Sequence, residues 1–209
     1  MNVIEQLKWR YATKKFDTTK ALTKGQLKIL KEAFNLTALS YGLQTLKLVI
    51  IQNKETREDL VKHSYGQRQV VDASHLLVIC IQNEINEADV NSHFENIKAI
   101  RNTPDAILEP FKNQLTSTIK AMPETNKKDW AIRQAYIALG NLMTVCAIEK
   151  IDSCPMEGFN PEAYDEALDL KIKGLRSVLL LPVGYRAEDD MFSTFKKVRK
   201  TIDNTVIEL

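Results

Sequence analysis

Residues 130–149, WAIRQAYIALGNLMTVCAIE, decide how the rest of the chain can fold. The stretch has the length and composition of a helix, but apolar residues occupy nearly its whole circumference. A helix that is apolar all round is buried, so we expect this one at the centre of the fold or in an interface between subunits. Its small residues allow close approach of a neighbouring backbone: Ala131, Ala135, Ala138, Gly140 and Ala147.

Three short apolar runs predict the strands that such a helix would cover. Residues 46–52, 76–81 and 177–183 are dominated by Leu, Val and Ile, as in strands that are buried on both faces. Helices are predicted between them. Thr23 and Gln26 form a capping box before an amphipathic helix that ends near Asn35, and residues 54–63 are typical of another helix. Asn160 and Pro161 are an N-cap and first-turn pair for a helix over 162–170.

Two segments stand apart from this core. Residues 87–122 predict a polar helical excursion that is broken at Pro104. Its predicted apolar face consists of Phe94, Ile97, Ile100, Ile107, Phe111 and Leu115. Residues 191–209 have no strong helical stripe and predict an extended C-terminal tail, of a kind that can add a strand to the sheet of another subunit. We interpret 1–209 as one domain that includes both segments.

Composition excludes several classes of protein. The chain has 209 residues, of which 44% are hydrophobic, so it can bury a core, and neither disorder nor a small disulfide scaffold fits. Its 29 Lys and Arg residues against 27 Asp and Glu give a net charge of only +2, which argues against general binding to nucleic acid or anionic membranes. The N-terminus does not resemble a signal peptide, and no run of about 20 apolar residues is uncharged. We therefore expect a cytoplasmic protein.

The chain also lacks the common catalytic motifs. Its seven glycines are too dispersed for a dinucleotide-binding turn, a Walker A loop or a nucleophile elbow. Its three histidines have no metal-binding spacing, so we expect no metal site. Cys80, Cys146 and Cys154 are odd in number and have no C-x-x-C spacing, which indicates reduced and mostly buried thiols.

The residues with chemical potential are basic and lie near both ends of the chain. Arg10 and Lys14 near the start, with Lys197 and Arg199 near the end, have spacings that could converge on one anion. Arg offers a planar fork to phosphate oxygens and Lys a mobile point charge, so these residues could clamp a phosphate. Charge alone equally fits a solvated surface.

Loops supply the remaining candidates. Residues 155–159, PMEGF, could present backbone N–H groups to a ligand or could simply connect two helices. Residues 40–44, SYGLQ, together with Gln67 and Gln69, could hydrogen-bond a heteroaromatic edge or lie in solvated turns.

Taken together, these pieces resemble the FMN-dependent nitroreductase family, close to the branch of oxygen-insensitive NAD(P)H nitroreductases and dihydropteridine reductases. The match spans nearly the whole chain. It rests on six motifs in order: residues 7–17 (LKWRYATKKFD), 40–44, 72–75 (DASH), 134–141 with Gln134-Ala135-Tyr136 and Gly140-Asn141, 155–159, and 197–199 (KVR).

The resemblance implies an α+β, nitroreductase-like sandwich with a central mixed β-sheet flanked by helices. It also implies a domain-swapped homodimer with tails that reach across the partner and with one FMN in each of two interfacial sites. In such a site, cations would hold the FMN phosphate and the pyrimidine edge of the flavin: Arg10, Lys14, Lys197 and Arg199. Further cofactor-binding positions implied in the same way are Tyr11, Ala12, Ser40, Gly42, Gln69, Pro155, Glu157 and Gly158, of which Glu157 and Gly158 would face the N5 region of the flavin.

The implied activity is that of an FMN-dependent oxidoreductase. NADPH or NADH would reduce the cofactor, which would then reduce nitroaromatics, quinones or related small acceptors in a ping-pong cycle without an indispensable catalytic side chain. A second hypothesis is flavin chemistry on one metabolite, such as an enone, a pteridine or a halogenated aromatic. A third is a flavin-binding, storage or sensor protein without nicotinamide-driven turnover. A fourth is an interaction protein without a chromophore. The chain departs from the branch at Ala12, Leu39, Gly42, Thr45-Leu46 and Gln69, so the flavin potential and substrate preference are less defined than FMN use.

Overall fold

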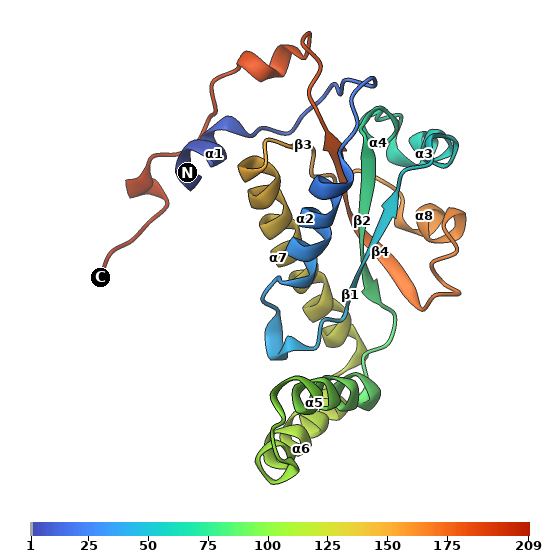
Figure 1. The fold of residues 1–209 in the computed structure, drawn as a ribbon, viewed down its shortest axis with the longest axis vertical. Coiled ribbons are helices and arrows are strands. Elements are labelled where there is room, and N and C mark those ends of the chain that lie inside the picture. Colours follow the sequence, from blue (N-terminus) through green and yellow to red (C-terminus); the bar gives the residue numbers. More distant parts are fainter. Residues whose placement is uncertain (1) are drawn as a thin grey trace.

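A four-stranded antiparallel sheet forms the centre of the computed structural model, which describes residues 2–209 (Figure 1). The strands are β1 (Leu46–Ile51), β2 (His75–Gln82), β3 (Asp152–Ser153) and β4 (Leu175–Gly184), in the order β1-β2-β4-β3. The three apolar runs are thereby confirmed as strands. Strand β3 was not predicted, because two residues are too few to show a periodic pattern.

We expected a mixed sheet, but parallel pairing is nearly absent within one chain. All neighbouring strands run antiparallel, and the parallel pairing among the described residues is a single bridge between Ala12 and Ser153. The connection after β1 explains part of this. It consists of α3 (Lys54–Val61), a 3-10 turn and α4 (Gln69–Asp72). Because α3 is only about 12 Å long and packs on α4, the chain re-enters the sheet at the end where β1 left it.

Residues of β2 and β4 alternate between two hydrophobic clusters, one on each face of the sheet. Leu77, Ile79 and Leu181 belong to the cluster under α2 (Lys24–Asn35) and α7 (Glu124–Ile148). Leu76 and Val78 belong to the opposite cluster, which α3, α4 and α8 (Pro161–Ala167) cover. Figure 1 shows these helices on opposite sides of the sheet. The α+β sandwich is thus a three-layered core, in which the strand period of two separates the layers.

The central helix predicted around residues 130–149 is confirmed as α7, which begins six residues earlier than expected, at Glu124. Its residues Ala131, Ala135 and Ala138 are fully buried against the sheet and α2. A Cβ added at Gly140 would meet nothing within 4 Å, so this glycine does not serve a close approach within the chain. By length and composition alone, α7 is apolar enough to cross a membrane, a test that the buried core helix of a globular protein also passes. Of its most apolar stretch, 44% is buried inside the protein.

Two helices form the excursion, α5 (Glu87–Arg101) and α6 (Asp105–Ala121), and the break falls at Pro104 as predicted. Phe94 and Leu115 are buried. The prediction of a buried apolar face is wrong at three positions, because the side chains of Ile100, Ile107 and Phe111 are 83%, 67% and 46% exposed. The reason is position: the α5–α6 hairpin projects below the sheet, and only its base has a core to pack against (Figure 1).

Local signals at helix ends were accurate. The capping box of Thr23 and Gln26 is present, and Asn160 caps α8 with Pro161 in its first turn. The helix expected over 162–170 ends earlier, at Ala167, because Asp169 adopts a left-handed conformation with φ 52°. The three cysteines are confirmed as free and buried, and burial raises the pKa of each thiol.

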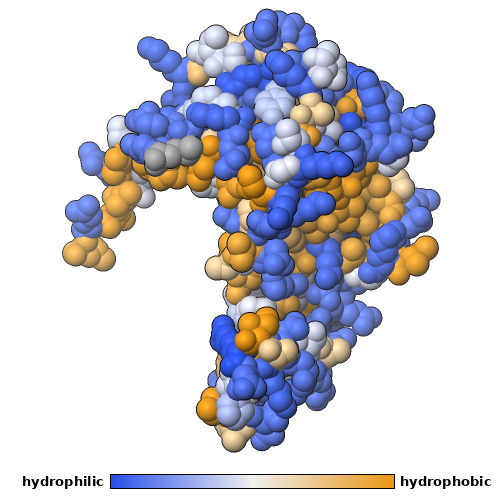
Figure 2. Space-filling model, in the orientation of Figure 1, coloured by the Kyte–Doolittle hydropathy of each residue, from blue (hydrophilic) through white to orange (hydrophobic). Residues whose placement is uncertain are grey.

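The N-terminal helix α1 (Val3–Trp9) and residues 191–209 extend from one side of the body at the end opposite to α5 and α6 (Figure 1). The C-terminal segment contains two short 3-10 helices, Met191–Thr194 and Ile202–Asn204, and is exposed along nearly its whole length. Figure 2 shows apolar surface over the middle of the molecule, at the level of β1, α2 and α7, whereas the upper and lower parts are mostly hydrophilic.

Close packing of α7 makes a first prediction. Ala135→Leu should lower the free energy of unfolding by roughly 1–3 kcal/mol, because a larger side chain has no room at a fully buried position. Gly140→Ala on the same helix is the matched control and should raise stability by up to about 1 kcal/mol, since its Cβ meets open space and Ala favours helix. Urea unfolding at one protein concentration measures both. Equal effects of the two variants would contradict the packing of α7 described above.

Candidate functional site

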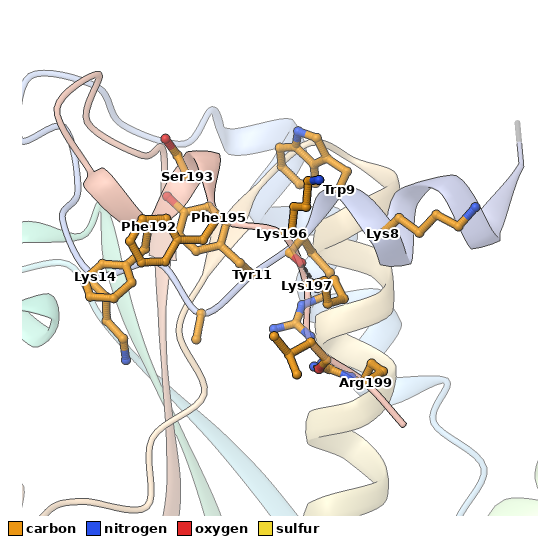
Figure 3. Close-up of a pocket in the computed structure, with 13 residues that line it drawn as sticks. Lys8, Trp9, Tyr11, Lys14, Phe192, Ser193, Phe195, Lys196, Lys197 and Arg199 are labelled. Carbon is orange, nitrogen blue, oxygen red and sulfur yellow. Dashed lines mark hydrogen bonds between the residues drawn. The ribbon is translucent and has the colours of Figure 1, made fainter. Parts of the chain in front are cut away.

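Half of the predicted cofactor-binding positions line one pocket of about 390 Å³ (Figure 3). Residues 10–12 and Lys14 come from the segment after α1, and Lys197 and Arg199 come from the C-terminal segment. Figure 3 shows Lys14 at one end of this pocket and Arg199 at the other. Two stretches that are more than 180 residues apart in the sequence therefore share one cavity, which we call the clamp pocket.

The sheet positions the N-terminal wall of the clamp pocket. After α1 ends at Trp9, the chain becomes extended at Arg10. Ala12 bridges to Ser153 of β3, and the backbone N–H of Thr13 donates to the Ser153 carbonyl over 3.2 Å. Residues 10–14 are thereby aligned with the edge of the sheet.

The carboxylate of Asp190 joins the two walls of the clamp pocket. It is only 3% exposed and accepts hydrogen bonds from the Tyr11 hydroxyl at 2.8 Å and from the backbone N–H groups of Lys14 at 3.0 Å and Lys15 at 3.1 Å. Its other oxygen accepts from the N–H of Phe192 at 3.1 Å. Burial alone would raise the pKa of Asp190, but these donors together lower it below its ordinary value. The carboxylate therefore stays ionised and ties residues 11–15 to the start of the C-terminal segment.

Aromatic and cationic side chains stack behind the clamp pocket. The guanidinium of Arg186 lies 4.4 Å from the ring centre of Trp9 and 4.5 Å from that of Tyr11. Asp152 accepts from the Nε of Arg186 at 2.8 Å and is itself buried. This stack fixes Trp9 and Tyr11 by cation–π contacts and anchors them to β3.

Lys8, at the rim of the clamp pocket, is paired with Glu5, but the four predicted cations have no acidic partner among the described residues. Among residues 2–209, no carboxylate lies within 4 Å of the charged groups of Arg10, Lys14, Lys197 or Arg199. Burial, and then the charge of Arg199, lower the pKa of Arg10. Burial and the charges of Arg10 and Arg199 likewise lower the pKa of Lys197, whose Nζ donates to the Arg10 carbonyl. The Nε of Arg10 is buried and has no hydrogen-bond partner among the described residues.

Such a cluster has a clear chemical preference. Like charges repel each other in the partly buried pocket, and an anion with several oxygens would relieve this repulsion and accept the unused donors. Arg side chains match phosphate with a planar fork, and the longer Lys side chains can adjust to it. The residues present therefore fit the phosphate of FMN.

The structure places Ser40 and Gly42 elsewhere, on a 3-10 turn (Ser40–Gly42) that precedes β1. The backbone N–H of Ser40 donates to Oε1 of Gln134 in α7 at 2.8 Å. Tyr41 and Gly42 have φ values of 57° and 71°, so two adjacent residues adopt the left-handed conformation. A non-glycine residue such as Tyr41 rarely adopts it, and such strain concentrates at functional sites.

The remaining four predicted positions form a third group, which does not line the clamp pocket. Gln69 begins α4 and is half-buried. The Gly158 carbonyl accepts from the side-chain amide of Gln67 at 2.8 Å, and the Tyr136 hydroxyl donates to Oε1 of Glu157 at 2.7 Å. Tyr136 and Gln67 therefore hold the loop that follows the half-buried Pro155.

Several lining residues were missed from the sequence. Trp9, Phe192 and Phe195 contribute aromatic surface to the clamp pocket, and the rings of Phe192 and Phe195 lie 5.4 Å apart, edge to face. Their spacing of three residues was a weak helical signal inside a segment that otherwise had none. Asp190 gave no signal for the site, because its partners in the N-terminal wall are more than 170 residues away.

The fold and this cationic pocket define a class of α+β proteins that can hold an anionic cofactor, and comparison with known proteins gives the family. The model of the nitroreductase family matches residues 7–185. The chain therefore belongs to the nitroreductase family.

Individual relatives agree over nearly the full length. A protein of Staphylococcus epidermidis named "Putative NAD(P)H nitroreductase" is 33% identical over 98% of this chain and 95% of its own length. Two crystal structures named "putative nitroreductase" share the fold. One is from Bacillus subtilis (TM-score 0.88, 22% identity, 99% and 98% of the two chains), and one is from Exiguobacterium sibiricum in complex with FMN (TM-score 0.84, 19% identity, 100% and 98% of the two chains).

The left-handed turn at Gly42 makes a second prediction. A Cβ at this position would lie 2.8 Å from Cε1 of His93, in addition to the backbone strain. Gly42→Ala should therefore cost the roughly 1–2 kcal/mol of a left-handed alanine plus the smaller cost of turning the His93 ring aside. Gly66→Ala is the control, because Gly66 has a similar φ of 75° and nothing within 4 Å of its Cβ. Thermal unfolding compares the two. If His93→Ala does not remove the difference, the contact between Gly42 and His93 is wrong.

Proposed function

We propose that this protein is an FMN-dependent NAD(P)H oxidoreductase that reduces nitroaromatics, quinones or related small electron acceptors. The observation that carries the proposal is the unpaired cationic cluster around the buried Nε of Arg10, which needs an anion. Membership of the nitroreductase family supports it. So do the names of the relatives and the FMN complex of a protein with the same fold.

Arg10, Lys14, Lys197 and Arg199 would bind the phosphate and the polar edge of the cofactor. FMN, when bound, supplies the exchange of a hydride equivalent with nicotinamides and acceptors. The protein contributes binding and electrostatics: Arg10 is half-buried, and a cation partly withdrawn from water stabilises added negative charge more strongly than the exposed Lys14, Lys197 and Arg199 do. Glu157 and Gly158, held by Tyr136 and Gln67, would line the reactive side.

We further propose that the functional unit is a domain-swapped homodimer. The structure separates the predicted cofactor residues, since Ser40 and Gly42 lie on another part of the chain from the clamp pocket. Strand β1 has one neighbour among the described strands, and a groove beside it is lined by the apolar Phe34, Leu39 and Leu48. The tail offers exposed Val206, Ile207 and Leu209. A tail from a second copy could pair with this free strand edge and fill the groove.

The phosphate clamp makes a third prediction. The double variant Lys14→Ala/Arg199→Ala should bind FMN at least about tenfold more weakly, because hydrogen bonds to charged groups contribute roughly 1.5–3 kcal/mol each. Riboflavin lacks the phosphate but keeps the polar edge of the ring, so the double substitution should weaken riboflavin binding less than FMN binding. Flavin fluorescence titration measures both ligands.

Lys200→Ala provides the matched control for this prediction. Lys200 is exposed and adjacent to Arg199 but does not line the clamp pocket. This variant should keep the FMN affinity of the parent protein. Light scattering should give the mass of two chains for all three proteins. An unchanged FMN affinity of the double variant would refute the phosphate clamp.

The catalytic proposal is tested by two half-reactions without oxygen, which is the fourth prediction. NADPH or NADH mixed with the FMN-loaded protein should bleach the visible absorbance of the flavin. A quinone or nitroaromatic added afterwards should restore it. Retention of FMN without bleaching by either nicotinamide would contradict the oxidoreductase proposal and would indicate a flavin-binding protein without nicotinamide-driven turnover.

A further inference from the structure

A second pocket, of about 480 Å³, lies between the turn at Ser40–Gly42 and the α5–α6 hairpin. Gly42 forms part of one wall, and α5 and α6 supply the others. We call it the hairpin pocket. Neither the turn nor the hairpin lines the clamp pocket.

The walls of the hairpin pocket are mainly apolar and aromatic. Phe94 and Phe111 pack edge to face with ring centres 5.7 Å apart, and Ile97 and Leu108 lie beside them. Phe111 and Ile107 line the pocket and yet remain largely exposed. Exposed apolar surface in a concave site favours burial by an apolar ligand. A flat aromatic or conjugated molecule fits such walls.

One side of the hairpin pocket is cationic. Arg101, at the end of α5, lines the pocket, and among residues 2–209 no carboxylate lies within 4 Å of its guanidinium. Nearby Lys98 is different, because its Nζ is paired with Asp105 at 2.7 Å. No Asp or Glu lines the pocket. Burial, and then the charge of Arg101, lower the pKa of His93, which leaves Arg101 as the charged group that faces a ligand.

The hairpin pocket and the clamp pocket lie at opposite ends of α7. Tyr41, in the hairpin pocket, packs on Trp130 with ring centres 6.1 Å apart. Trp9, in the clamp pocket, lies 4.5 Å from Nζ of Lys150. Twenty helical residues correspond to about 30 Å, which is longer than FMN. One FMN in the clamp pocket therefore cannot reach the hairpin pocket of the same chain, and in the homodimer proposed above the hairpin pocket would face the cofactor of the second copy.

We propose that the hairpin pocket binds the electron acceptor and selects flat apolar acceptors that carry a carboxylate or similar anionic group, which Arg101 recognises. This inference rests on the proposed function, because Gly42 is one of the positions expected beside the flavin. The apolar walls would hold the body of the acceptor, and the charge of Arg101 would distinguish an acid from its neutral amide.

The test compares two acceptors of the same shape, p-nitrobenzoate and p-nitrobenzamide. In each reaction the nitro group is reduced to nitroso: it takes two electrons and two protons and loses one oxygen as water. NADPH is oxidised to NADP⁺ and supplies the hydride, and solvent supplies the other proton. The measured quantity is the ratio of kcat/KM for the acid to that for the amide.

Arg101→Gln should lower this ratio by about one-and-a-half- to fivefold, the range expected for one exposed ion pair. Lys112→Gln is the matched control, since it removes one positive charge from α6 at a position that does not line the pocket. Its ratio should equal that of the parent protein. An unchanged ratio in Arg101→Gln, or an equal fall in both variants, would overturn the proposal.

A binding measurement separates this proposal from the proposed function. Naphthoate, which a hydride donor does not reduce, should bind the oxidised FMN-loaded protein more tightly than naphthamide does, and Arg101→Gln should abolish this preference. If NADPH fails to bleach the flavin while naphthoate binding still depends on Arg101, the oxidoreductase proposal and the acceptor role fall, and the anion site stands. If naphthoate and naphthamide bind equally to the parent protein, the anion site itself is wrong.

Discussion

The arrangement of the clamp pocket depends on one buried carboxylate, that of Asp190. Four donors converge on it, three of them backbone N–H groups, from two segments that share no regular secondary structure. An ionised group is costly to bury unless its hydrogen bonds are complete, so loss of any donor would weaken the attraction of the others. The carboxylate therefore makes the N-terminal and C-terminal walls interdependent. The cations of the two walls repel one another, and Asp190, which does not line the pocket itself, holds their backbones together.

Two features that oppose stability occur at the candidate sites. Arg10 retains a buried Nε without a partner, and the left-handed residues Tyr41 and Gly42 precede β1. Similar features occur elsewhere, since the buried Nε of Arg57 has no partner among the described residues either, and Asp169 is left-handed. The two arginines differ in their other nitrogens, because those of Arg57 donate to backbone carbonyls, whereas Arg10 lies beside cations without acidic partners. An unmet hydrogen-bonding requirement combined with unbalanced charge is a physical argument for a ligand.

Features set by short-range periodicity could be predicted from the sequence. The capping box at Thr23, the break at Pro104 and the central helix α7 follow from residues within a few positions of one another. The antiparallel order of the sheet and the exposure of Ile100 and Phe111 depend on where distant segments pack, which periodicity does not encode. The candidate site shows the same division. Its cations could be predicted from the charged residues near the two ends of the chain. The role of Asp190 could not, because it depends on contacts that form only when the two ends meet in the fold.

The predicted cofactor residues lie in separate regions of one chain, so a complete cofactor site would need two chains. A single chain offers a cationic pocket at one end of α7 and an apolar pocket beside Gly42 at the other. Neither contains all the predicted cofactor residues, because the first lacks Ser40 and Gly42, and the second has apolar walls without a phosphate clamp. Antiparallel apposition of two copies along α7 would bring each cationic pocket to the apolar pocket of its partner. The apolar circumference of α7, which exceeds what one chain buries, is then explained by the same apposition that completes the site.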